Sequence, residues 1–174
     1  MIRFIADLHF DDAEAMRYDK RPFETVEEMN SAIIKAWNST VMPKDTVYVL
    51  GDVADNRNGN RIKEIIRQLK GRKILVIGNH DKSRTDEFWR ECGFAEVYRA
   101  KAIILEDWLV IGHEPPAYMS REVPWVWLYG HVHDSEMYQT ITGYSACVCA
   151  SRWDYKPVSK QYLLGHMQYH RART

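Results

Sequence analysis

Three short runs rich in β-branched residues each end directly in glycine or polar residues, and this pattern restricts the fold most strongly. The runs are Ile2 to Ala6 before Asp7, Thr46 to Leu50 before Gly51-Asp52, and Lys73 to Ile77 before Gly78-Asn79-His80-Asp81. Between them, Thr25 to Val41 and Arg61 to Leu69 have apolar residues near the 3.6-residue period of a helix, and Thr25 is the expected N-cap of the first. Strands that alternate with helices predict a buried, mostly parallel sheet with polar residues at its strand ends.

The second half of the chain has a different pattern. After a short helix near Thr85 to Cys92, closely spaced strands predict a second, more antiparallel sheet. The expected strands are Glu96 to Arg99, Ala102 to Leu105, Trp108 to Ile111, Val126 to Tyr129 and Ser145 to Ala150. With 174 residues, 45% of them hydrophobic, and no repeat or interdomain linker, we expect one domain over residues 1–174.

Composition limits the partners. The 24 basic and 24 acidic residues give a formal net charge of +0, so no global field favours nucleic acid or a membrane surface. The longest apolar runs have the length of strands, far short of a membrane span, and the N-terminus has no charged leader before a long apolar stretch. The cytoplasm is therefore the expected compartment, and no membrane contact is expected. The oligomeric state is not predicted.

The three cysteines, Cys92, Cys147 and Cys149, are an odd number. Cys147 and Cys149 are neighbours on one face of an expected strand, which is a poor geometry for a disulfide. We expect all three to be reduced packing residues.

Several polar motifs at strand ends are suited to binding metal. In Asp7-Leu8-His9, alternate residues of an extended segment point the same way, so a carboxylate and an imidazole can converge on one ion. Taken alone, this fragment also fits a turn carboxylate beside a surface histidine. Gly51-Asp52 adds an acid after the second strand, and Gly78-Asn79-His80-Asp81 adds an amide, an imidazole and a carboxylate after the third.

The second half repeats this arrangement in Gly112-His113 and in Gly130-His131-Val132-His133. Five of the seven histidines follow apolar strands, namely His9, His80, His113, His131 and His133. One such histidine would usually be a core residue satisfied by hydrogen bonds. Five of them, together with two or three carboxylates, indicate a site for borderline divalent ions.

In this order the motifs Asp-x-His, Gly-Asp, Gly-Asn-His-Asp, Gly-His and Gly-His-x-His resemble those of the calcineurin-like metallophosphoesterase family. The match runs from Asp7 to His133, while Arg21-Pro22-Phe23 and Arg152 to Val158 are similar to a small phage-type or bacterial branch. The resemblance implies an α/β (α+β) fold, a four-layer αββα sandwich of two mixed sheets flanked by helices. The metals would lie at the strand ends.

Carried over position by position, the resemblance implies two divalent metal ions. One would be bound by Asp7, His9 and His133, the other by Asn79, His113 and His131, with Asp52 as the bridge. Mixed oxygen and nitrogen ligands favour Mn, Fe, Zn or Ni over Ca, and we favour Mn. Two such cations lower the pKa of a bound water and supply hydroxide for an in-line attack on phosphorus.

Further roles are expected beside the metals. His80, adjacent to Asn79, is the expected general acid for the leaving group. Asp55 resembles the acid that orients this histidine in many relatives. The competing role for Asp55 is a loop N-cap, and Asp81 is a rival partner of the histidine. Phosphoprotein phosphatases of the family have an arginine directly after that acid, whereas here it is Arg57, one residue later.

The expected rim of the site has both positively and negatively charged side chains. Arg17 and Arg57 are the predicted substrate-binding residues. Asp11 and Asp12 stand where similar small members often have Gly-His, and they would repel a polyanionic substrate unless they face away, with Arg17, Tyr18 and Arg21 placed to offset them. The aromatic group Tyr118, Trp125, Trp127 and Tyr129 has two readings, a core face or a platform that stacks nucleic-acid bases.

The predicted function is hydrolysis of a small phosphate ester, either a monoester or a diester. One alternative is a nuclease, but the neutral charge and the lack of an added DNA-binding region weigh against it. Another is a non-catalytic, metal-bound protein-interaction module. Inactive relatives typically lack the histidine of Gly-Asn-His or several ligands, whereas here His80 and all seven ligand positions are filled.

Overall fold

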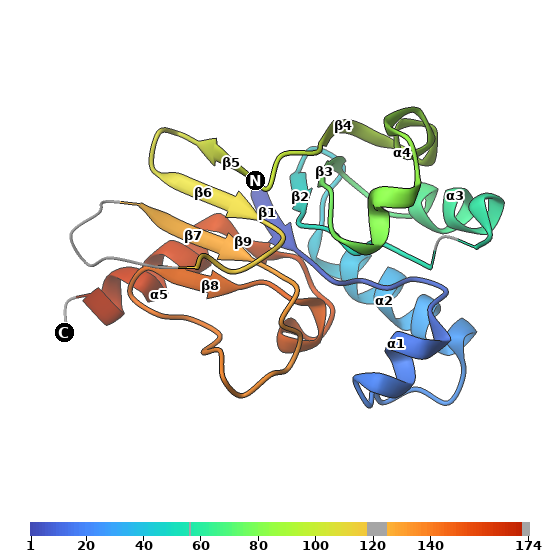
Figure 1. Cartoon of the computed structure of the whole chain (residues 1–174), viewed down its shortest axis with the longest axis horizontal. Helices are drawn as coiled ribbons and strands as arrows, with labels where there is room; N and C mark the ends of the chain where they lie inside the picture. Colours follow the sequence, from blue (N-terminus) through green and yellow to red (C-terminus); the bar gives the residue numbers. More distant parts are fainter. Residues whose placement is uncertain (56, 118–124, 172–174) are drawn as a thin grey trace.

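A computed structural model describes residues 1–55, 57–117 and 125–171, and two mixed β-sheets form its centre (Figure 1). The first sheet has the strand order β4-β3-β2-β1-β9. Its strands are β1 (Ile2–Ile5), β2 (Thr46–Val49), β3 (Arg72–Val76), β4 (Phe94–Tyr98) and β9 (Val158–Ser159). Strands β1 to β4 are parallel, as predicted, and β9 pairs with β1 in the antiparallel direction.

The second sheet has the order β5-β6-β7-β8, with β5 (Ala102–Leu105), β6 (Leu109–Gly112), β7 (Val126–Tyr129) and β8 (Ser145–Cys147). Strands β5 and β6 form an antiparallel hairpin, whereas β6, β7 and β8 are parallel. The second sheet is therefore mixed, with one antiparallel pair, and it is less antiparallel than the closely spaced strands predicted. Residues 113–125 and 130–144 are long enough to return the chain to the starting edge, which parallel pairing needs. The run predicted at Glu96 to Arg99 belongs to β4 and lies in the first sheet.

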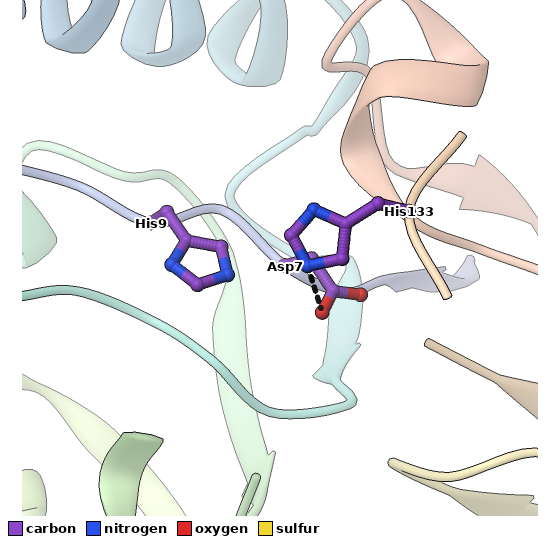
Figure 2. A group of neighbouring side chains, drawn as sticks. All are labelled: Asp7, His9 and His133. Atoms are coloured by element: carbon purple, nitrogen blue, oxygen red, sulfur yellow. Dashed lines mark ion pairs between the residues drawn. The ribbon is translucent and has the colours of Figure 1, made fainter. Parts of the chain in front are cut away.

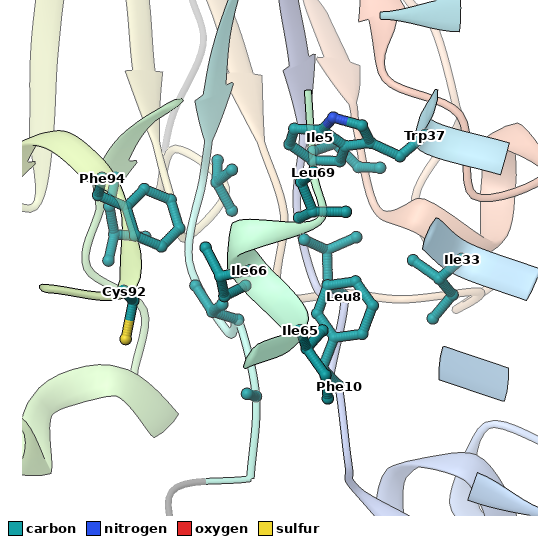
Figure 3. Close-up of a cluster of buried hydrophobic side chains, with 14 of the residues drawn as sticks. Ile5, Leu8, Phe10, Ile33, Trp37, Ile65, Ile66, Leu69, Cys92 and Phe94 are labelled. Atoms are coloured by element: carbon teal, nitrogen blue, oxygen red, sulfur yellow. The ribbon is translucent and has the colours of Figure 1, made fainter. Parts of the chain in front are cut away.

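Three helices pack on the first sheet, close to their predicted positions: α2 (Val26–Thr40), α3 (Gly59–Arg67) and α4 (Asp86–Cys92). The Thr25 side chain accepts a hydrogen bond from the backbone N–H of Glu28, so it is the N-cap of α2 as expected. Figure 3 shows Ile33 and Trp37 of α2 and Ile65 of α3 in one buried cluster with residues from β1 and the loop after it.

A second core joins the two sheets. Phe4 of β1 and Val76 of β3 belong to one buried cluster with Ile111 of β6 and Leu128 of β7. Helix α5 (Lys160–Arg171), which was not predicted, packs against β1 and β9 and adds Leu163 to the same cluster. Two mixed sheets with flanking helices confirm the predicted fold class.

Smaller elements complete the described chain: α1 (Ala13–Tyr18) and the 3-10 helices η1 (His80–Ser83) and η2 (Ala150–Trp153). The three cysteines are free and buried, as expected. Of the aromatic group, Tyr129 is buried, Trp127 is half-buried and Trp125 is 45% exposed, while Tyr118 lies outside the described residues. Among the described helices, none is long and apolar enough to cross a membrane.

Candidate metal centre

The seven predicted ligands lie together because each follows a strand whose neighbours end at the same edge. Asp7 and His9 follow β1, Asp52 follows β2, Asn79 follows β3, His113 follows β6, and His131 and His133 follow β7. The strands β1, β2 and β3 are parallel and in register, and so are β6 and β7. The carboxyl ends of both sheets therefore meet at one site.

The first group of side chains is Asp7, His9 and His133. Their ligand atoms lie within 4.8 Å of one another, and His133 Nε2 is 3.4 Å from Asp7 Oδ1. Figure 2 shows the two imidazoles beside the Asp7 carboxylate, one from the loop after β1 and one from the loop after β7. This is the set that the family resemblance implies for one ion.

The second group is Asp52, His113 and His131, whose ligand atoms also lie within 4.8 Å of one another. The Asn79 side-chain oxygen joins it, 2.8 Å from His113 Nε2 and 3.0 Å from His131 Nδ1. The two ring nitrogens are 3.2 Å apart. One oxygen and two nitrogens thus converge on a small volume beside Asp52.

Asp52 lies between the two groups. Its Oδ2 is 3.3 Å from His113 Nε2 and 3.9 Å from His9 Nε2, while its Oδ1 accepts a hydrogen bond from the His80 backbone N–H at 2.9 Å. A carboxylate that reaches both groups has the position of the predicted bridge.

Hydrogen bonds orient three of the imidazoles. His113 Nδ1 is 2.7 Å from the Leu50 carbonyl oxygen, to which it must donate, so a neutral ring has its lone pair on Nε2, toward Asp52. His9 Nδ1 is 3.0 Å from Asp12 Oδ2, and His133 Nδ1 is 2.6 Å from Asp19 Oδ2. Acceptors on the outer ring nitrogen are the usual partners of histidines that bind metal.

The fit to a divalent ion rests most directly on His9. Its Nε2 is buried and has no hydrogen-bond partner within the part of the chain that the structure describes. A buried nitrogen without a partner is costly, and a cation beside it would remove that cost. The mixture of imidazole nitrogens with carboxylate and amide oxygens is typical of sites for borderline divalent ions.

The backbone of the site is strained. Five predicted ligands have φ values in the left-handed region, which residues other than glycine rarely occupy. The values are 57° for Asp7, 49° for His9, 53° for Asp52, 70° for His131 and 45° for His133. Each such residue costs on the order of 1 to 3 kcal/mol and persists only where the surroundings hold it. Five of the 11 non-glycine residues with positive φ in the described part of the chain are predicted ligands, so the surroundings must hold these loops in place.

Glycines allow the close approach of these loops. A Cβ atom on Gly51, whose φ is +86°, would lie 2.5 Å from Gly78 Cα and 2.6 Å from His113 Nδ1. A Cβ atom on Gly130 would lie 2.5 Å from Asp7 Oδ2. Any side chain at either position would collide with the site.

The charges of the site are strongly coupled. Burial alone would raise the pKa of Asp52, but the hydrogen bond and charge of His113, with help from the His80 N–H and His9, lower it to about 2. Burial alone would lower the pKa of His113, but its hydrogen bond to Asp52 and the charges of Asp52 and Asp7 raise it to about 9. In the metal-free protein, a proton on His113 therefore compensates part of the carboxylate charge.

The outer carboxylates are also ionised. Hydrogen bonds from His9 and from backbone N–H groups outweigh burial and lower the pKa of Asp12 to about 2. His133 and Arg21 likewise outweigh burial and lower the pKa of Asp19, and the pKa of His133 rises in return.

Asp81 supports the loop after β2. It is fully buried, and its carboxylate accepts hydrogen bonds from the backbone N–H groups of Asp52, Val53 and Gly78 at 2.8, 2.9 and 2.9 Å. Burial and the charge of Asp52 raise its pKa to about 6, against these three bonds. Because both oxygens accept backbone hydrogen bonds, Asp81 holds together the loops after β2 and β3.

A cavity of about 660 Å3 opens beside the first group of ligands. We call it the main cavity; its lining includes His9, His80, His131, His133, Asp55 and Arg57. His80 is exposed, and its ring centroid is 5.2 Å from that of His9. Arg57 Nε donates to Asp55 Oδ2 at 2.6 Å. His80 is thus at the cavity wall, where the expected general acid must be.

The residues predicted at the rim of the site differ from one another in burial and in their contacts. Arg17 is exposed on α1 and is not among the described residues that line the main cavity. Arg21 is buried, and it donates to the carbonyl oxygens of Asp7 and Leu8 at 2.9 and 2.8 Å. Arg21 therefore supports the loop after β1, and the carboxylate charge that it offsets is that of Asp19 in the wall of the main cavity, at 3.2 Å. Asp11 turns to Asn30, whose Nδ2 donates to it at 3.1 Å.

The partners of the imidazoles were not predicted from the sequence. Asp12 was expected only to repel a polyanionic substrate, and no role was expected for Asp19, although each accepts a hydrogen bond from a predicted ligand. For Asp12 a signal was present, since an aspartate directly before the helical residues Ala13–Tyr18 is a typical N-cap. For Asp19 no local signal existed, because its partner His133 is 114 residues away.

Comparisons with known proteins agree with this geometry. The family described as calcineurin-like phosphoesterase matches residues 1–167. The uncharacterized protein MJ1445 of Methanocaldococcus jannaschii is 33% identical over 137 residues, which cover 78% of this chain and 71% of that protein. The Gene 66 protein of Mycobacterium phage L5 is 36% identical over 80 residues, 45% of this chain and 38% of that protein. A protein of unknown function from Aquifex aeolicus, AQ665, has a crystal structure that is similar with a TM-score of 0.68 at 25% identity, over 93% of this chain and 96% of that one.

Proposed function

Because this chain belongs to the calcineurin-like phosphoesterase family, we propose that it is a metal-dependent hydrolase of phosphate esters. One observation carries the proposal: two groups of ligand atoms, each within 4.8 Å, adjoin at Asp52, and the buried His9 Nε2 in one of them has no partner among the described residues.

The proposed metal ligands follow from these groups. Asp7, His9 and His133 would hold one divalent ion, Asn79, His113 and His131 a second, and Asp52 would contact both. When bound, two such ions lower the pKa of water and offset negative charge on phosphate oxygens. We favour Mn among the ions that this donor set suits.

His80 is the proposed general acid. Its backbone is fixed by the hydrogen bond from its N–H to Asp52 Oδ1, while its exposed ring lines the main cavity. An imidazole in that position can donate a proton to the oxygen of a departing alcohol. Asp55 lines the same cavity and is the proposed carboxylate that orients His80.

The substrate is proposed to be a small phosphate ester. A cavity of about 660 Å3 is within the range of roughly 300 to 1,000 Å3 that is usual for small-molecule sites. Arg57, bound to Asp55, is the proposed phosphate contact, and Arg17 remains a predicted contact farther out.

The test is turnover of p-nitrophenyl phosphate and bis(p-nitrophenyl) phosphate by protein that has been stripped with chelator and reloaded with Mn. We expect turnover of both esters that chelator abolishes. With phenyl phosphate, whose leaving group needs a proton, we expect His80→Ala to reduce turnover by about 10² to 10⁴. His166→Ala is the matched control, because His166 is an exposed histidine on α5 outside the main cavity. Absence of turnover with Mn, Fe, Zn and Ni would contradict the proposal.

A further inference from the structure

A second cavity of about 260 Å3 adjoins the proposed metal centre, and we call it the side cavity. Its lining includes Asn79, Lys82, Arg99, Lys101, His113 and Glu114. Asn79 and His113 are proposed ligands of the second ion, and His113 Nε2 is 3.2 Å from His131 Nδ1, which belongs to the wall of the main cavity. The metal centre therefore opens on two sides.

Helix η1 separates the two openings. His80 and Ser83 of this short element line the main cavity, whereas Lys82 lines the side cavity. Because the proposed general acid is His80, the leaving group of a substrate would lie in the main cavity. The side cavity is then open to the substituent that stays on phosphorus.

The two cavities differ in charge. The main cavity is lined by four carboxylates and one arginine in addition to its histidines: Asp12, Glu14, Asp19, Asp55 and Arg57. The side cavity has three cationic side chains and one carboxylate, Glu114. An anionic substituent would be repelled on the first side and attracted on the second.

Two of the cations are available to a ligand. Arg99 is engaged, because its Nε donates to Asp86 Oδ1 at 2.6 Å. The side chains of Lys82 and Lys101 have no hydrogen-bond or ion-pair partner among the described residues, and both are exposed. Two unpaired lysines that line one small cavity are suited to a phosphate group, since each ammonium group brings three N–H donors.

The size of the side cavity limits what it can hold. About 260 Å3 is below the usual range for a whole small molecule and fits one substituent. We propose that Lys82 and Lys101 bind a second phosphate of the substrate, so that the preferred substrates are phosphate esters with another phosphate on the group that stays on phosphorus. This inference rests on the proposed function.

The test compares two esters that share a leaving group. Thymidine 5′-(p-nitrophenyl phosphate) carries one phosphate, and its 3′-phosphorylated form carries a second one on the retained group. We expect the wild-type protein with Mn to prefer the second ester by about tenfold or more in kcat/KM, and the preference to weaken with added salt. The double variant Lys82→Gln, Lys101→Gln should lose the preference, whereas Lys44→Gln, an exposed lysine away from both cavities, should keep it.

The outcomes separate the inference from the proposed function. Turnover of both esters with equal kcat/KM would leave the function intact and overturn the inference. Binding of thymidine 3′,5′-bisphosphate and thymidine 5′-phosphate, measured by calorimetry on the Mn-loaded protein, decides the inference without turnover. Tighter binding of the bisphosphate that the double variant loses would support it, and equal binding in wild type and variant would overturn it.

Discussion

Asp12 accepts a hydrogen bond from the ring of His9 with one carboxylate oxygen and caps the N-terminus of helix α1 with the other. Its Oδ2 is 3.0 Å from His9 Nδ1, and its Oδ1 accepts the backbone N–H groups of Glu14 and Ala15 at 3.0 and 2.9 Å. The orientation of one proposed ligand thus depends on the residue that caps the neighbouring helix.

The variant Asp12→Asn separates these two tasks. Asparagine caps a helix about as well as aspartate, but its amide would place an N–H group against the N–H of His9. We expect Mn affinity to fall about 10- to 100-fold, with helix content unchanged. Calorimetric titration with Mn and circular dichroism measure both quantities. Asp107→Asn, in the β5–β6 turn, is the control, and equal affinities in the two variants would show that Asp12 does not support the ion.

Arg21 should matter for stability although it does not reach the main cavity. Replacing it with Met leaves the carbonyl oxygens of Asp7 and Leu8 without their donor and removes a partner of buried Asp19. We expect Arg21→Met to lower the free energy of unfolding of the metal-free protein by about 2 to 5 kcal/mol in urea denaturation. Arg17→Met, on the exposed face of α1, should change it by less than about 0.5 kcal/mol. A small effect at Arg21 would contradict its supporting role.

Gly130 and Gly165 should respond in opposite ways to the same substitution. A Cβ atom at Gly130 would meet the Asp7 carboxylate, whereas one at Gly165 in α5 meets nothing within 4 Å. Gly130→Ala should therefore lower stability by about 1 to 3 kcal/mol and weaken Mn binding. Gly165→Ala should add about 0.5 to 1 kcal/mol, because alanine favours a helix, and should leave Mn binding unchanged. Thermal unfolding with and without Mn distinguishes these outcomes.

Metal binding should release protons at neutral pH. The pKa of His113 is raised to about 9 in the metal-free protein, chiefly by Asp52 against the effect of burial, so its ring is protonated below that pH. An ion must displace this proton, and its apparent affinity should rise with pH up to about 9, by about tenfold per unit for each proton displaced. Titrations with Mn between pH 6.5 and 8.5, in buffers of different ionisation enthalpy, measure the affinity and the protons released. A pH-independent affinity would contradict this prediction.

The grouping of these side chains was predictable because its signal is local. Each motif is a strand followed by polar residues, with a glycine first in every motif except Asp7-Leu8-His9, and parallel strands bring such ends together. Strand direction in the second sheet was not predictable, because apolar runs such as Val126–Tyr129 do not encode it. The contacts that orient or support the ligands were also not predictable, because their partners are far apart in the sequence. Asp19 meets His133, and Arg21 meets the backbone before His9, only after the loops fold back.

Helix α1 has a histidine partner at each end, because Asp12 precedes its first residue and Asp19 follows its last. Those histidines come from the loop after β1 in the first sheet and the loop after β7 in the second. One six-residue helix therefore connects, through its two flanking aspartates, loops from both sheets. The same helix contributes Glu14, Ala15 and Tyr18 to the wall of the main cavity. A substrate that displaced this wall would also displace both imidazoles. The width of the main cavity and the geometry of the first group of proposed ligands would therefore change together.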